Sequence, residues 1–408
     1  MGLNMKEKKA VIRETAARYQ KAEKKGKTKI LDEYIELTKY NRKYASWILR
    51  NWGKAVFIRI KGKLVKLVAG EIKNKKRRNK PKKYNHTVLK AIIKIWYIFD
   101  CMCGKRLAPA LRSMLPILLK YDEIDVSDEV VEKLKTISPA TIDRMLSGEK
   151  KKICFKSRSY TKPGTMLKHQ IPIRTFSDWD EDKPGFLELD LVGHDGGNTR
   201  GDFAYTLNAT DVNSGWTEMR AVKNRAQKWV FEALLDIKQS IPFKVLGIDS
   251  DNGSEFINAQ LKRYCEAQSI TFTRSRPYRK NDNCFVEQKN NSIIRNTVGY
   301  LRYDTEEELR IINELYNSLR LLVNFFYPSM KLIMKTRIGS KVKRKYDIPK
   351  TPCQRLLKSD SVSSSLKQKL KAQFDKLNPA ALKRTVTKLQ NRLIKLVKTK
   401  QTLMEFVI

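Results

Sequence analysis

Long apolar runs, histidine and closely spaced cysteines are all scarce in this sequence of 408 residues. No stretch of about 18 apolar residues occurs, so we predict no membrane-spanning helix. The first 19 residues lack the apolar core of a secretion signal. The six cysteines and three histidines do not show the spacing of a zinc finger. We therefore expect a cytoplasmic protein whose thiols are reduced and packed as small apolar side chains.

Acidic residues are scarce as well, and mostly so toward the two ends. The chain has 84 Lys and Arg against 43 Asp and Glu, a formal net charge of +41. Residues 1–100 contain 29 basic and 8 acidic side chains, residues 201–300 contain 14 and 11, and residues 301–408 contain 24 and 9. Basic ends that flank a nearly neutral centre favour a polyanionic partner, because they neutralise phosphates and release counterions. The alternative is a lysine-rich proteome with solvated surfaces.

The first third of the chain is predicted to be mainly helical. Apolar residues in 30–51 form two short amphipathic groups around the turn TKYNRK, a pattern typical of a helix-turn-helix. The second helix, at roughly 41–51, would offer Arg42 and Lys43 to a DNA groove. A plain helical hairpin explains the same pattern.

A short hairpin and a basic run come next. Residues 54–70 alternate apolar and basic side chains around Lys-Gly, which predicts two strands. Residues 71–84 are too polar to pack, and we expect a solvated linker that lies on phosphates. Its expected DNA contacts are Lys76, Arg77 and Arg78.

A second helical block is predicted over residues 86–146. It ends in another helix-turn-helix candidate, in which Ser138 caps the last helix and Pro139 takes its first position. We assign residues 1–149 to an N-terminal DNA-binding region and residues 150–183, basic and broken by Pro and Gly, to a linker.

From residue 184 the pattern becomes that of an α/β domain. Three strands are followed by helix, strand, helix, strand and helix, which predicts a sheet that begins as an antiparallel meander and is covered by helices. In the first strand three leucines alternate with Glu188 and Asp190, so the acids share one face.

Three acids in this domain are placed where they can converge. Asp190 lies inside the first strand, Asp251 follows the fourth strand, and Glu287 begins the last helix. Three neighbouring carboxylates repel one another unless a cation neutralises them. Oxygen ligands favour hard ions such as Mg²⁺ or Mn²⁺. We expect Asp249, two residues before Asp251, to be a structural carboxylate.

The spacing of these acids is distinctive. An Asp, then Asp-Asn-Gly, then a Glu after 35 intervening residues within RPYRKNDNCFVEQKN resembles the catalytic core of the retroviral integrase superfamily. In particular it resembles the integrase-core (DDE) transposases of bacterial insertion sequences. The resemblance covers roughly 184–330 and implies an RNase H-like core, a mixed five-stranded sheet with helices.

The resemblance also implies chemistry and partners. Asp190, Asp251 and Glu287 would be the catalytic, metal-binding acids, with two Mg²⁺ (or Mn²⁺) ions per active site. The activity implied is cleavage and strand transfer at the ends of a mobile element. Double-stranded DNA and further copies of the chain would be its partners, on the nucleoid. The expected DNA contacts near the site are Arg279, Lys280, Lys289 and Arg295.

The chain departs from the family pattern at several points. The frequent Pro-Gln before the glutamate is absent, and Lys280, Asn281 and Cys284 stand in that region. No His/Cys zinc module precedes the core, and helix-turn-helix candidates take its place. Two lysines of the retroviral helix are replaced by Asn291 and Ile294.

Residues 331–408 are predicted to form a basic, partly helical tail. A first amphipathic helix is expected up to Leu377, and a second, beginning at Pro379, repeats leucines at three- and four-residue steps. Its apolar face suits either a multimer contact or a DNA clamp.

Two further functions of the whole protein stay open, a non-catalytic DNA-binding regulator that retains the fold and a simple nuclease.

Overall fold

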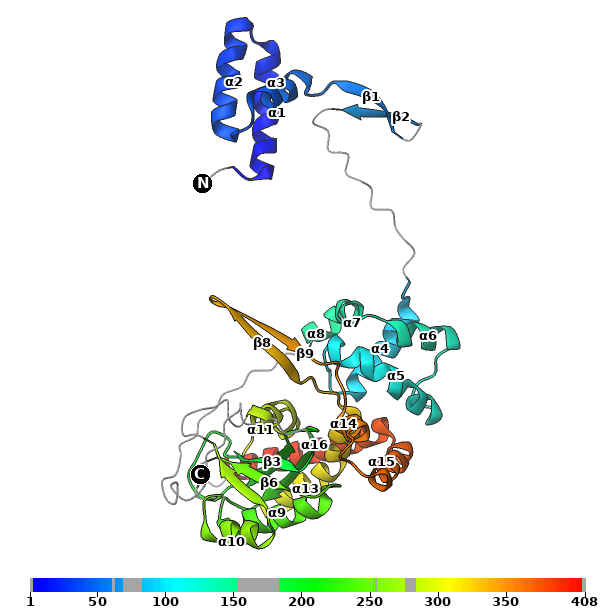
Figure 1. The fold of residues 1–408 in the computed structure, drawn as a ribbon, viewed down its shortest axis with the longest axis vertical. Helices are drawn as coiled ribbons and strands as arrows, with labels where there is room; N and C mark the ends of the chain where they lie inside the picture. Colours follow the sequence, from blue (N-terminus) through cyan, green and yellow to red (C-terminus); the bar gives the residue numbers. More distant parts are fainter. Residues whose placement is uncertain are drawn as a thin grey trace. The chain divides into compact units, whose positions relative to one another are not determined.

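The computed structural model of the protein describes residues 3–60, 63–68, 83–152, 183–251, 253, 255–275 and 284–405. The chain divides into two compact units, Met1–Pro81 and Lys82–Ile408, which are shown in Figure 1. The described helices include none with the length and apolarity needed to cross a bilayer.

The N-terminal unit is a small bundle followed by a hairpin. Apolar side chains of all three helices meet in one core, with Ala16, Tyr34 and Leu49 fully or almost fully buried. Asn41 caps the third helix by accepting a hydrogen bond from the Lys43 backbone N–H (2.9 Å). The predicted helices and hairpin are confirmed as elements. They are α1 (Met5–Lys21), α2 (Lys24–Thr38), α3 (Arg42–Asn51), β1 (Ala55–Ile60) and β2 (Lys63–Val68).

The second unit is organised around a five-stranded sheet with strand order β5-β4-β3-β6-β7. The first three strands in the sequence pair antiparallel, while β6 and β7 are parallel to β3. This arrangement confirms the mixed sheet and the antiparallel meander expected from the sequence. The strands are β3 (Phe186–Gly193), β4 (Tyr205–Asp211), β5 (Thr217–Val222), β6 (Gly247–Ser250) and β7 (Thr271–Arg274).

Helices cover this sheet. The helix α11 contacts β3 and β4, α9 contacts β4 and β5, and α10 contacts β7. The long helix α13 contacts β5 and begins with a capping box at Thr305 and Glu308. The elements are α9 (Gln227–Ser240), α10 (Ala259–Ala267), α11 (Cys284–Lys289), the π-helix η2 (Asn290–Arg295), α12 (Asn296–Val298), α13 (Glu306–Leu321) and the π-helix η3 (Leu322–Phe326).

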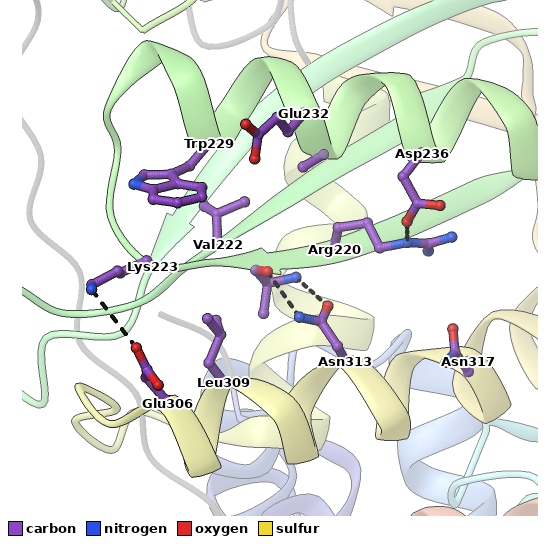
Figure 2. Close-up of a pocket in the computed structure, with 12 residues that line it drawn as sticks. Arg220, Val222, Lys223, Trp229, Glu232, Asp236, Glu306, Leu309, Asn313 and Asn317 are labelled. Atoms are coloured by element: carbon purple, nitrogen blue, oxygen red, sulfur yellow. Dashed lines mark hydrogen bonds and ion pairs between the residues drawn. The ribbon is translucent and has the colours of Figure 1, made fainter.

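The edge strand β5 is closed by two asparagines. The Asn313 side chain accepts from the Ala221 N–H (2.8 Å) and donates to the Ala221 carbonyl (3.0 Å), as Figure 2 shows. Asn324 does the same for Thr217, at 2.8 and 2.9 Å. Side-chain amides thus occupy backbone groups that an exposed edge would offer to another chain.

Residues 83–152 belong to the second unit, not to the N-terminal one with which the sequence analysis grouped them. Their apolar residues share one hydrophobic core with the sheet and the C-terminal helices. The Ser138 cap is confirmed, because its hydroxyl accepts from the Thr141 N–H (3.3 Å) and Pro139 occupies the first turn. The helices are α4 (His86–Ile98), α5 (Gly104–Lys120), α6 (Asp128–Thr136), α7 (Pro139–Met145) and α8 (Ser147–Lys152).

The C-terminal region contains a hairpin that the sequence analysis did not predict. The hairpin is β8 (Leu332–Ile338) and β9 (Lys341–Tyr346), and it precedes three helices. The apolar face of the last helix, including Val386 and Leu393, is buried against α13 of the same chain. That face is therefore occupied within the chain and is free for neither of the two uses expected. The helices are α14 (Pro352–Lys358), α15 (Ser364–Lys376) and α16 (Pro379–Glu405).

Candidate active site

Two of the predicted acids lie at neighbouring positions of parallel strands. In the β3–β6 ladder Leu189 is the partner of Ser250, and the next residue along each chain is Asp190 or Asp251. Residues at matching positions point to the same face of a sheet. The two carboxylates therefore share one face at the carboxyl end of β6, where α/β sheets commonly place functional groups.

The third acid, Glu287, is carried by α11, which packs on β3 and β4. Burial and the negative charges of Asp251 and Glu287 together raise the pKa of Asp190 to about 8. Like charges act this way only at short range. The structure thus brings the three acids into one electrostatic neighbourhood.

Two asparagines that the sequence analysis missed orient Asp190. The Asn290 side chain donates a hydrogen bond to Asp190 Oδ2 (2.6 Å), and Asn208 donates to Asn290 Oδ1 (2.7 Å). Asn208 is also the partner of Asp190 in the β3–β4 ladder. Asn290 comes three residues after Glu287, so the two share a side of the helix. That spacing was the available signal.

A second pair of acids lies beneath the first. Glu188 and Asp249 are partners in the β3–β6 ladder, and both are buried. Glu188 Oε2 accepts from the Val286 N–H (2.9 Å), and Asp249 Oδ1 accepts from the Thr273 hydroxyl. Burial holds the pKa of Glu188 well above its usual range, and the charge of Asp249 contributes. The Glu188 contact attaches the start of α11 to β3, one residue before Glu287.

The carboxylate oxygens of the site are ligands that suit a hard cation, although the described side chains do not converge on one point. Among the residues that the structure describes, no three His, Cys, Asp or Glu side chains lie close enough to hold a metal ion. The Asp251 carboxylate is fixed by the Gly253 N–H (2.9 Å), and burial raises its pKa. Clustered carboxylates with raised pKa values become fully ionised when a divalent cation replaces their protons.

Of the basic residues expected near the site, Lys289 and Arg295 are described. Burial, together with the charges of Arg106 and Arg355, lowers the pKa of Lys289 to about 7. Arg295 has an intramolecular role, because it donates to the Gly193 carbonyl (2.7 Å) and its guanidinium lies 4.8 Å from the centre of the Tyr300 ring. A DNA contact by either residue stays a prediction. Arg279 and Lys280 lie outside the described residues.

The basic residues expected in the N-terminal unit are placed in part. Arg42 and Lys43 are exposed at the start of α3, and Arg42 forms an ion pair with Asp32 of α2. Trp47, one turn further on, is 54% exposed. The helix thus presents basic and aromatic side chains together, and DNA binding by it stays a prediction. Lys76, Arg77 and Arg78 lie outside the described residues.

His194 makes its contacts in the protein core and not with the three acids. It is buried and shares a hydrogen bond with the Thr206 hydroxyl (2.7 Å), and burial lowers its pKa to about 3. A groove between α9, β5 and α13 is also separate, since its lining includes Trp229, Glu306 and Asn313 but none of the three acids, as Figure 2 shows. Neither feature belongs to the candidate active site.

Comparisons with known proteins identify relatives of the chain. The model of the integrase core domain family matches residues 180–280, a range that contains Asp190 and Asp251 and ends before Glu287. An uncharacterized protein, y4rM of Sinorhizobium fredii (strain NBRC 101917 / NGR234), is 36% identical over 338 residues, which is 83% of this chain and 91% of that protein.

Two solved structures are also similar to parts of the chain. One is the catalytic core domain of BIV integrase, with 18% identity, a TM-score of 0.28, and coverage of 41% of this chain and 90% of that one. The other is the HTLV-2 integrase catalytic core domain in complex with magnesium, in a dimeric form, with 18% identity and a TM-score of 0.27. It covers 36% of this chain and 90% of that one.

Proposed function

The chain belongs to the integrase-core superfamily, and on that premise we propose that it is a DDE transposase. It would bind the ends of its mobile element and catalyse metal-dependent DNA cleavage and strand transfer. The observation that carries the proposal is the placement of Asp190 and Asp251 at matching positions of parallel strands, with Glu287 on the helix packed over them. We place the protein in the cytoplasm, on the nucleoid, as a multimer on double-stranded DNA.

Asp190, Asp251 and Glu287 would hold Mg²⁺ or Mn²⁺, two ions per active site. When bound, such ions polarise the scissile phosphate and lower the pKa of the attacking hydroxyl. In cleavage, a water oxygen bonds to phosphorus in line with the leaving 3′-oxygen, which departs as the new 3′-hydroxyl. In strand transfer that hydroxyl attacks a target phosphate, and a target 3′-oxygen leaves. No bond between protein and DNA is needed.

The protein's own residues would keep the carboxylates in position. Asn290 at the start of η2 holds Asp190 Oδ2, the Gly253 N–H fixes Asp251 Oδ1, and Glu188 secures the helix that carries Glu287 through Val286. Each of these contacts limits the motion of a carboxylate before a cation binds, so that less conformational entropy is lost on binding.

Strand transfer by the purified protein tests this function. The substrate is DNA from both borders of the protein's own gene, with Mg²⁺ or Mn²⁺, and the control is Asp251→Asn. Joined products that disappear in the control are expected. Specific binding without cutting or joining under both metals would instead support a non-catalytic regulator that retains the fold. Cutting without joining or preference for those borders would indicate a nuclease.

A further inference from the structure

The hairpin β8–β9 is bare on both faces. Every residue of Leu332–Ile338 and Lys341–Tyr346 is exposed, and Figure 1 shows an isolated two-stranded ribbon. A lone two-stranded hairpin is at best marginally stable in water. A ribbon of this kind therefore implies a partner that covers it.

The charge of the ribbon indicates which partner. Residues 332–346 contain six basic side chains and no acidic one. Cross-strand pairs share a face, and the faces alternate along a strand. Lys335 is paired with Arg344 on one face, and Lys343 is paired with Thr336 on the other. Basic residues therefore line both faces, and a ribbon enclosed on both sides by phosphates would have this pattern. Those six are Lys335, Arg337, Lys341, Lys343, Arg344 and Lys345.

The dimensions of the ribbon fit a groove of duplex DNA. Paired strands are about 4.8 Å apart, and the major groove, about 12 Å wide, admits a two-stranded β-ribbon. The exposed apolar side chains Met334 and Ile338, 54% and 60% exposed, suit contact with thymine methyl groups in that groove. Apolar and basic groups thus have separate uses in one ligand.

The base of the ribbon is anchored. The Lys331 N–H donates to Asp347 Oδ1 (2.7 Å), and the Asp347 N–H donates to the Lys331 carbonyl (2.9 Å). Arg355 of α14 binds Asp347 Oδ2 (2.6 Å) and the Ser329 carbonyl (2.8 Å), in an ion pair that is mostly shielded from water. The contrast between a fixed base and a bare tip is typical of an arm that reaches into a ligand.

We propose that β8–β9 is a DNA-binding arm that inserts into a groove of duplex DNA. This inference rests on the proposed function, which identifies the polyanion as DNA. It adds to that function the element of the chain that binds the DNA. The ligand is duplex DNA, held by phosphate contacts of the arm's lysines.

Salt-dependent binding of the full-length protein to a 40-base-pair duplex tests the arm. The variant is Lys341→Gln/Lys343→Gln/Lys345→Gln, and the matched control is Lys369→Gln/Lys371→Gln/Lys376→Gln, three exposed lysines of α15. Binding is measured without metal, so that chemistry does not contribute. Each lost phosphate contact lowers the salt slope by about 0.9. We expect the arm variant to lose about 3 in slope and about tenfold or more in affinity, and the control to change less than about twofold.

Equal weakening of both variants would show a diffuse charge effect and would overturn the proposal. An arm variant with unchanged DNA affinity would also overturn it. If that variant then lost self-association in light scattering, the arm would bind a second copy of the chain. Failure of the transposase proposal is distinguishable, because a wild-type protein that never joins DNA ends can still show arm-dependent binding. Normal strand transfer with an arm that does not affect binding would remove the inference alone.

Discussion

The strand β5 is the edge of its sheet, and the hairpin β8–β9 is a two-stranded sheet of its own, and the two are covered in opposite ways. Asn313 and Asn324 occupy the open backbone groups of β5, whereas every residue of the hairpin strands is exposed. An edge closed by the chain itself serves stability and prevents strand addition. A ribbon left bare and strongly basic serves a ligand. The same secondary structure thus indicates different roles, depending on what covers it.

The largest expected effect separates the sheet, which carries the proposed catalytic acids, from the arm, which is proposed to bind DNA. Asp190→Asn and Asp251→Asn should abolish strand transfer, a loss on the order of a thousandfold or more, and leave duplex affinity within about twofold. The physical reason is that each removes a ligand charge from the sheet and none from the arm. Joined products and gel-shift affinities, measured on the same preparations, check this. A variant of either acid that joins ends at the wild-type rate would contradict the site.

Asn290→Ala should have a smaller effect on the same site. Loss of the hydrogen bond to Asp190 leaves that carboxylate free to rotate, and groups that orient metal ligands are typically worth about 10–100-fold in metal affinity or activity. The measurement is the Mn²⁺ concentration that gives half-maximal joining. Asn291→Ala, a change at the exposed neighbouring residue, is the matched control. Equal effects of the two substitutions would show that Asn290 has no positioning role.

Asn313→Ala tests the role of the asparagine contacts at the edge strand β5. It leaves the Ala221 N–H and carbonyl without their partner, and an unsatisfied buried group costs about 1–3 kcal/mol. We expect about 2 kcal/mol less stability in urea unfolding and faster aggregation on heating. Asn317→Ala, one turn along α13 and exposed, should be nearly neutral. Similar losses in both would mean that the edge contacts contribute nothing specific.

The smallest expected effect is on stability, and it concerns α16, a helix that follows the arm in the sequence and is packed against the rest of the chain. The Arg384 guanidinium of α16 is hydrogen-bonded to Glu123 and lowers the pKa of that carboxyl to about 2. A depressed folded-state pKa adds stability that is present above the unfolded value and lost as pH falls from about 4.5 toward 2. Arg384 is 64% exposed, so water screens the pair and the contribution should be about 1 kcal/mol.

Glu123→Gln should therefore destabilise the protein at pH 7 and have a diminishing effect below pH 4.5. Urea unfolding across that range measures the difference. Glu129→Gln, at a solvent-exposed pair with Lys133, provides the comparison. A penalty for Glu123→Gln that stayed constant down to pH 3 would exclude the ion pair as its origin.

The sheet and its acids were predictable because their signals are local. Alternation in residues 186–193 fixes the polar face of β3, and turn residues mark the end of β6 at Asp251. Asn290 was missed, although it lies three residues after Glu287, because its bond to Asp190 joins residues 100 positions apart. The arm was missed because basic residues on both faces hide the two-residue period of a strand. Residues 83–152 were misgrouped because their apolar faces do not reveal which partner they pack against.

The π-helix η2, Asn290–Arg295, follows α11 directly. Its wider turn sets the phase between two groups of contacts: Asn290 faces Asp190, while Ile293 and Ile294 are buried in the core. A regular α-helix advances about 100° per residue, and a π-turn accommodates one residue more than the α-helix needs. Deleting one residue after Asn290 would therefore rotate the remainder of the helix by about 100°. The length of this segment, and not only its composition, keeps the helix that carries Glu287 in register with the core.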